Sequence, residues 1–183
     1  MTATDEIPED AIDWVERVHA VIDELVAPIV AGHGPRLKCR SGCRDCCSDG
    51  LSVFAIEAAV IARHHGGLLA EGAPSEEGAC AFLDKEGACR IYAHRPYVCR
   101  TQGLPLRWLE REEGEPVEIR DVCPLNADDG PPLEELTGEE CWTLGPFEER
   151  LGSRQTSIDG GAGHRVPLRS LFGGPRHRLP ILR

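Results

Sequence analysis

The sequence predicts a small, single α+β domain that is rich in helix, contains short β-hairpins and is organised around metal ligation. Three observations support this class. Apolar residues recur at helical spacing over residues 9–31. Pairs of short apolar runs flank turn residues further along the chain. Eight of the nine cysteines lie between Cys39 and Cys123, and the length of 183 residues suits one domain with extensions.

The composition favours a metal-stabilised fold in a reducing compartment. Hydrophobic residues make up 41% of the chain but aromatic residues only 5%, so the core has few large side chains and would gain from a metal. The acidic N-terminus lacks a secretory pattern, and no apolar stretch approaches the roughly 20 residues that span a bilayer. We therefore expect a cytoplasmic protein without membrane contact, whose cysteines bind metal or act in catalysis rather than form disulfides.

The formal net charge of −11 is unevenly distributed. Residues 154–183 carry six arginines and one aspartate, a balance of +5, so the rest of the chain carries −16. An acidic body of this size repels a phosphate backbone, which argues against nucleic-acid binding by the main domain. We expect residues 153–183 to form a basic, glycine-rich and mobile tail. This tail either folds back on the acidic surface of the chain or docks on an acidic partner.

Residues 9–31 are the first expected element, an amphipathic helix with acidic residues between its apolar positions. Pro8 lies near its start, and Gly32 and Gly34 provide its end. We expect its apolar face to pack over the cysteine region, while binding of a protein partner is the alternative. The chain is accordingly divided into a helical segment (1–36), a cysteine-cluster metal-binding domain (37–152) and the tail.

The segment K-C-R-S-G-C-R-D-C-C-S-D, residues 38–49, concentrates four cysteines within nine residues. Cys43-x-x-Cys46 has the spacing of a metal knuckle, in which both sulfurs reach one ion. Gly42 permits the close backbone approach that such a turn needs. Adjacent side chains usually diverge, so Cys46 and Cys47 need not serve the same tetrahedral ion. Cys47 could face another metal, bridge two metals or pack in the core.

A second helix is expected over residues 51–65, with Ser52 as its N-cap and Gly66-Gly67 as its end. His64 and His65 would lie at that end, where capping or surface exposure is favoured over metal ligation. Residues 68–78 are expected to form a loop.

Two short apolar runs flank D-K-E-G within residues 79–92 and predict a hairpin, with Gly87 in the left-handed conformation. This hairpin would place Cys80 and Cys89 on neighbouring strands. Pro96 can open a short helix that holds Cys99 near its positive end, a setting that stabilises a thiolate.

Five arginines near the cysteines would offset the negative charge of a thiolate-rich site: Arg40, Arg44, Arg90, Arg95 and Arg100. A second hairpin is expected over residues 104–122, returning the chain to Cys123. A final helix is expected near Phe147. Cys141 has no partner at ligand spacing and is interpreted as a structural thiol.

Four blocks of the sequence occur in the order C-x3-C-x2-C-C, C-x-F-L-D-x-x-G-x-C-R-I-Y, R-P-x-x-C-R and a later cysteine. Together they resemble the YkgJ-type cysteine-cluster family, the zinc- or iron-chelating CxxCxxCC domain, over roughly residues 38–126. The resemblance implies a metal-binding module of undetermined physiological role. It implies these candidate metal ligands: Cys39, Cys43, Cys46, Cys47, Cys80, Cys89, Cys99 and Cys123. A related cysteine block occurs in flagellin lysine-N-methylases, which are much longer chains.

Three classes of function remain open. A metal-binding module would hold zinc or iron, and four thiolates suffice for one closed zinc site or one four-iron four-sulfur cluster. Eight thiolates would therefore serve two centres or include residues that are not ligands. The second class is an iron–sulfur-dependent enzyme or enzyme component, such as one modifying a protein side chain. The third is an interaction or metal-handling protein whose helix or basic tail meets a partner.

The enzyme class has little local support. Cys39-x3-Cys43-x2-Cys46 has radical-SAM spacing, but Asp45 stands where an aromatic residue usually precedes the last cysteine. The sequence also lacks a glycine-rich turn for a nucleotide-like cofactor. His94 could pair with a nucleophilic cysteine, although the excess of neighbouring thiols suits ligation better. No catalytic residue or substrate is therefore assigned.

Overall fold

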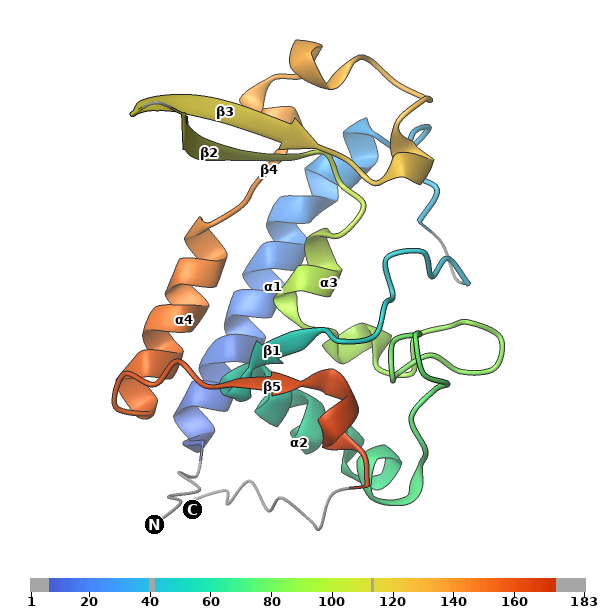
Figure 1. Cartoon of the computed structure of the whole chain (residues 1–183), viewed down its shortest axis with the longest axis vertical. Helices are drawn as coiled ribbons and strands as arrows, with labels where there is room; N and C mark the ends of the chain where they lie inside the picture. Colours follow the sequence, from blue (N-terminus) through green and yellow to red (C-terminus); the bar gives the residue numbers. More distant parts are fainter. Residues whose placement is uncertain (1–6, 40–41, 113, 174–183) are drawn as a thin grey trace.

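The computed structural model describes residues 7–39, 42–112 and 114–173, and its mixture of helices and short sheets confirms the predicted α+β class. Helix α1 (Glu9–Gly32) runs the length of the molecule (Figure 1). Its buried residues recur at steps of three and four, so the predicted amphipathic helix is confirmed. Within the described residues, none of the helices combines the length and the apolar character that a membrane span requires.

Strand β1 (Ser52–Phe54) and helix α2 (Ala55–Glu71) replace the helix predicted over residues 51–65. The predicted start was wrong because β1 pairs antiparallel with β5 (Arg165–Pro167), a partner more than a hundred residues away. The predicted end at Gly66-Gly67 was also wrong, since α2 continues through both glycines. It bends at His65, whose φ of −125° and ψ of 25° are non-helical.

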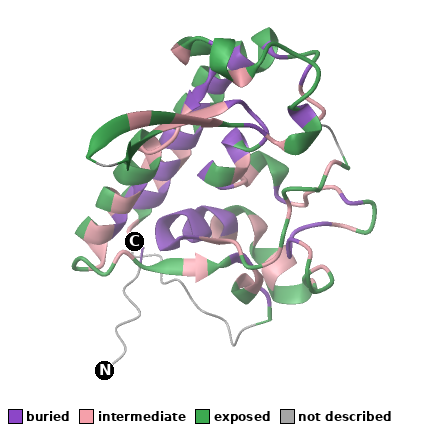
Figure 2. Ribbon diagram, turned by 45° about the horizontal axis from the view of Figure 1, so that its top comes forward, coloured by how far each residue is buried: buried purple, intermediate pink, exposed green. Residues whose placement is uncertain are grey.

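Two hydrophobic cores share α2. The first core lies between α1, the start of α2 and helix α4 (Pro146–Ile158), the helix that the sequence predicts near residue 147. The second core lies between α2, residues 80–91 and the segment 166–172. Every residue from Ala55 to Ile61 is buried, because α2 is covered on both sides (Figure 2). Apolar burial at this density is a major source of stability for the helical part of the molecule.

Strands β2 (Leu106–Glu112) and β3 (Glu115–Asp121) form an antiparallel hairpin, which confirms the prediction over residues 104–122. Strand β4 (Trp142–Thr143) joins β2 in parallel and gives the order β3-β2-β4. The sheet lies at the end of α1 remote from β1 and β5 (Figure 1).

The hairpin predicted over residues 79–92 does not form as strands. Only isolated bridges, Leu83 with Cys89 and Ser48 with Ala79, occur there. The turn itself is present, because Gly87 has φ of +82°, as expected. Regular strands are absent because the apolar residues of this segment pack against α2 from a largely irregular backbone.

Residues 153–173 pack on the body of the protein and do not begin as a separate tail. Residues 153–158 complete α4, and β5 and the short 3-10 helix Leu168–Leu171 follow. Arg154 pairs with Asp10, and Arg169 with Asp49. These ion pairs agree with folding back on the acidic surface. The expected mobile part beyond residue 173 lies outside the described residues, and the domain boundaries remain a prediction.

Candidate metal centre

Two segments without regular secondary structure carry five of the cysteines. We call residues 42–51 the first cysteine loop and residues 72–91 the second. The loops lie side by side because the N–H of Cys80 donates to the carbonyl of Cys47 at 2.8 Å, and Ser48 bridges to Ala79 (Figure 1). Two cysteines that are 33 positions apart in the sequence are thereby joined through their backbones.

The predicted knuckle forms a tight turn in the first cysteine loop. The N–H of Cys47 donates to the carbonyl of Arg44 at 2.8 Å, and Gly42 has φ of +86°. The side chains of Cys46 and Cys47 were expected to diverge, and this was wrong. A hydrogen bond between the two sulfurs lowers the pKa of Cys46 and raises the pKa of Cys47.

Cys39 lies in a first group of thiols with Cys43, Cys46 and Cys123. Burial raises the pKa of Cys39, a hydrogen bond from Asn126 opposes this rise, and the negative charge of the other three thiolates adds to it. Thiolates act on one another in this way only when they are close in space. The fold therefore brings Cys123, which follows β3, back to the beginning of the cysteine segment.

Asn126 organises this first group and was missed in the sequence analysis. Its side chain is fully buried, and its amide nitrogen lies 3.6 Å from the sulfur of Cys39 and donates to the carbonyl of Gly103 at 2.7 Å. Its amide oxygen accepts the N–H of Lys38 at 2.8 Å. The close approach excludes any side chain at residue 103, where a Cβ atom would lie 2.5 Å from the Cys39 sulfur. Proximity to Cys123 was the only local signal for this asparagine.

Cys47 lies in a second group with Cys80, Cys89 and Cys99. The pKa of Cys47 rises through the Cys46 hydrogen bond, through burial and through the charges of Cys46, Cys80 and Cys99. Burial is the main reason that the pKa values of Cys80 and Cys89 are raised. The thiols of this group are therefore protonated at neutral pH unless a metal ion displaces the proton.

Helix α3 (Tyr97–Thr101) holds Cys99 in its first turn, as Pro96 predicted. The buried carboxylate of Glu57 on α2 accepts the N–H of Tyr97 at 2.8 Å and pairs with His19 of α1 at 3.3 Å. The expected stabilisation of a Cys99 thiolate was wrong. Burial, reinforced by neighbouring thiolates, raises its pKa to about 12, so desolvation outweighs the dipole of a five-residue helix.

The arginines near the cysteines bind mostly to backbone carbonyls. Arg90 donates to the carbonyls of Ala73 and Ala81 at 2.8 and 2.7 Å, and Arg95 donates to that of Cys99 at 3.2 Å. The positive charges of Arg90 and Arg95 also oppose the rise in the pKa of Cys89. Arg90 and Arg95 thus fix the backbone of the loops by hydrogen bonds and offset the negative charge of the thiolates. Arg44 lies against Gly87, Arg100 pairs with Asp23, and Arg40 lies outside the described residues.

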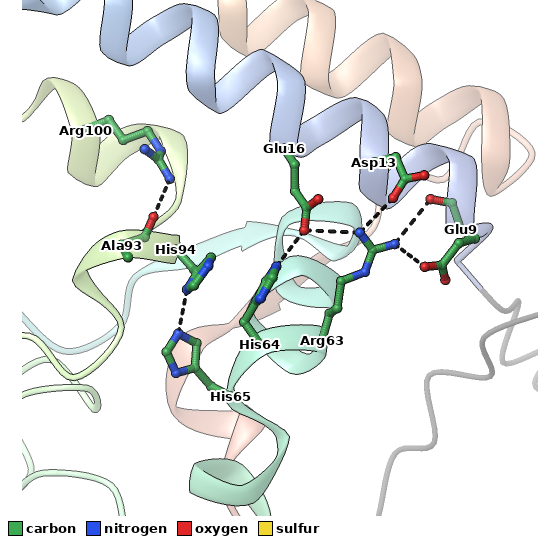
Figure 3. Close-up of polar contacts among 9 residues, drawn as sticks. All are labelled: Glu9, Asp13, Glu16, Arg63, His64, His65, Ala93, His94 and Arg100. Carbon is green, nitrogen blue, oxygen red and sulfur yellow. Dashed lines mark hydrogen bonds and ion pairs between the residues drawn. The ribbon is translucent and has the colours of Figure 1, made fainter.

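Three histidines form a polar junction between α1, α2 and the 3-10 helix Tyr92–His94 (Figure 3). His94 stacks on His64 with ring centroids 3.8 Å apart, and its Nδ1 lies 3.0 Å from Nε2 of His65. His64 also pairs with Glu16 at 2.7 Å. Capping by His64 and His65 was wrong, because α2 continues past them, whereas the surface exposure predicted as the other option is confirmed for His64. Among the described residues, no hydrogen bond joins a histidine to a cysteine.

Cys141 is buried apart from the two groups. Burial raises the pKa of its thiol, and the nearby charged groups are the side chains of Arg120, Arg107, Glu118 and Glu140. All nine cysteines are free thiols.

The donor set fits a thiophilic metal, since thiolate sulfur is a preferred ligand of zinc and of iron–sulfur clusters. In the described part of the chain, however, no three Cys, His, Asp or Glu side chains are gathered closely enough to hold a metal ion. The two groups are therefore neighbouring sets of thiols rather than a closed coordination sphere.

Residues 38–124 match the CxxCxxCC family, whose description is "Putative zinc- or iron-chelating domain". This match includes all eight cysteines of the two groups, and it confirms the resemblance over that segment. It leaves out α1, Cys141, α4 and β5. No curated protein and no solved structure was found to match the chain.

Proposed function

We propose that the protein binds metal, and that the eight clustered thiols of residues 38–124, the segment that matches the CxxCxxCC family, hold zinc or iron. The observation that carries the proposal is the backbone bond between Cys47 and Cys80, which joins the two cysteine loops. A cytoplasmic location is part of the proposal, because reducing conditions keep such thiols available as ligands.

We propose that the thiols divide into two sets of four and that each set serves one centre. The first set is Cys39, Cys43, Cys46 and Cys123. The second set is Cys47, Cys80, Cys89 and Cys99. Four thiolates are the number that a closed zinc site or a four-iron four-sulfur cluster uses. The adjacent residues Cys46 and Cys47 would then belong to different centres.

Zinc would supply a structural cross-link between the loops, whereas an iron–sulfur cluster would also supply an electron-transfer centre. The chain contributes the surroundings of either group. Cys80 and Cys99 are largely removed from water, and Arg90 and Arg95 offset the accumulated negative charge. Because most of these thiols are protonated in the metal-free protein, metal binding releases protons and strengthens as pH rises.

Anaerobic purification followed by metal analysis, sulfide analysis and visible absorption on one sample tests the proposal. Two metals per chain without colour would identify zinc. Iron with acid-labile sulfide and a brown charge-transfer band would identify clusters and would favour the alternative of an iron–sulfur-dependent enzyme. Protein with paired disulfides and no metal would contradict the proposal.

Variants in each set test the division into two centres. Cys43→Ser and Cys89→Ser are each expected to remove the metal of one set, and the double variant is expected to remove both. Cys141→Ser is the matched control, since this cysteine is buried but lies outside both sets. Loss of all metal from either single variant would contradict two independent centres. Loss of metal from Cys141→Ser would add this thiol to the ligands.

A further inference from the structure

Arg169 connects both cysteine loops from outside the family segment. It lies in the 3-10 helix Leu168–Leu171, beyond residue 124 where the family match ends. Its Nε donates to the carboxylate of Asp49 at 2.8 Å. Its two terminal nitrogens donate to the carbonyls of Ser75 at 2.8 Å and of Glu76 and Ala79 at 2.9 Å. One guanidinium therefore satisfies four acceptors, one from the first loop and three from the second.

The residues that Arg169 contacts are next to proposed ligands. Asp49 lies two positions after Cys47, and Ala79 immediately precedes Cys80. Asp49 adds further links, because its carboxylate accepts the N–H of Gly78 at 3.2 Å and that of Gly50 at 3.1 Å. The Arg169–Asp49 pair thus lies beside the Cys47–Cys80 backbone bond. Both interactions hold the first and second cysteine loops together.

The segment that carries Arg169 has its own rigid support. Val166 of β5 pairs with Val53 of β1, and the N–H of Leu168 donates to the carbonyl of Leu51 at 2.9 Å. Phe172 is buried in the second core with its ring centroid 4.9 Å from that of Phe82. These contacts do not involve the arginine side chain. Backbone pairing and the packing of Phe172 therefore position Arg169 beside the loops. We expect the segment to stay folded when the side chain of Arg169 is replaced.

We propose that Arg169 is a positioning residue for metal binding, and that the C-terminal segment completes the CxxCxxCC domain in this chain. This inference rests on the proposed metal-binding function. By fixing the two loops in the metal-free protein, Arg169 reduces the entropy that the loops would otherwise lose when Cys47 and Cys80 bind the same centre. Residues that orient metal ligands without touching the metal typically change affinity about 10- to 100-fold when replaced.

The test compares Zn²⁺ affinity, measured by competition with a chromophoric chelator, in the full chain and its variants. Arg169→Met is expected to weaken binding at the second set about 10- to 100-fold. Arg169→Lys is expected to recover part of the loss, since lysine retains the charge and can donate to fewer acceptors. Arg154→Met is the matched control, because Arg154 lies in the same basic region but pairs with Asp10 on α1.

Amide exchange of the metal-free proteins separates positioning from general stability. In Arg169→Met, exchange is expected to quicken at residues 47–50 and 78–80 while α1 and the start of α2 keep their protection. Asp49→Asn provides a second route to the same loss if the methionine variant does not fold. Unchanged Zn²⁺ affinity in folded Arg169→Met and Asp49→Asn would overturn the inference. Absence of Zn²⁺ or iron binding by the wild-type chain would instead overturn the proposed function.

Discussion

The first cysteine loop and the first two turns of α2 are close in sequence and opposite in packing. Every residue from Ala55 to Ile61 is buried, whereas no residue from 42 to 51 is buried (Figure 2). The helix is stabilised by apolar burial, which needs no partner outside the protein. The loop carries three cysteines and is stabilised by hydrogen bonds and by the Arg169–Asp49 pair. The helix therefore gains its stability from hydrophobic burial, whereas the loop depends on polar contacts and on the proposed metal.

The largest expected effect is in the helical part. Ile22 on α1 is fully buried, so Ile22→Ala is expected to lower the free energy of unfolding by about 2–5 kcal/mol. Leu25 on the same helix is 49% exposed, and Leu25→Ala is expected to cost less than about 0.5 kcal/mol. Urea unfolding of both variants with and without metal checks this. If Ile22→Ala lowered the free energy of unfolding only in the metal-free protein, the helical part would not be independent of the metal.

Metal removal is expected to act on the loops and spare the helices. A metal present at about 100 times its dissociation constant stabilises the folded chain by about 2.7 kcal/mol, which a chelator would remove. Amide exchange is expected to accelerate in residues 42–51 and 72–91, while residues 55–61 stay protected. Uniform acceleration over both regions would show that the helical part also depends on the metal.

Asn126→Ala tests the hydrogen bonds that connect the first group of cysteines to Gly103 in the body of the protein. Loss of its amide leaves the N–H of Lys38 and the carbonyl of Gly103 without their partner, at a cost of about 1–3 kcal/mol. Metal content of the first set is expected to fall as well, because the amide also contacts Cys39. The neighbouring Leu125 is 45% exposed, and Leu125→Ala serves as the control. Unchanged stability and metal content in Asn126→Ala would remove this residue from the site.

The smallest expected effect is a pH dependence at the histidine junction. Burial lowers the pKa values of His65 and His94, with like-charge repulsion from His64 added. A lowered histidine pKa means that the unfolded chain binds protons more tightly than the folded one. The stabilising contribution is therefore complete above the ordinary histidine pKa near 6.5, and it is lost as pH falls from there toward the folded-state value.

Thermal unfolding with chelator present, at pH 7.5 and 5.5, measures this effect. The wild type is expected to lose more stability on acidification than the double variant His65→Gln, His94→Gln. Glu16 does not interfere in this window, because its own pKa is lowered and its contribution is lost only at more acidic pH. Equal losses in the two proteins would mean that the junction does not titrate between these pH values.

The elements that were predicted well depend on neighbours along the chain. The periodicity of residues 9–31 repeats within each turn of α1, and the β2–β3 hairpin closes over a short turn that contains Gly114. The strands predicted over residues 79–92 did not form, because the apolar runs bury Phe82 and Ile91 against α2 and the C-terminal segment and pair through only one isolated bridge, Leu83 with Cys89. A local pattern records that a residue is buried, but not which surface buries it.

The amino-acid sequence alone was enough to predict the cysteine segment, the resemblance of residues 38–124 to the CxxCxxCC family and the two elements whose signals are local. The pairing of Ser52 with Pro167, the contact of Asn126 with Cys39 and the four bonds of Arg169 became visible only in the folded chain. These contacts join residues about 90 to 120 positions apart. Their energies depend on a fold that must already bring the segments together, so nothing in the neighbouring residues marks them.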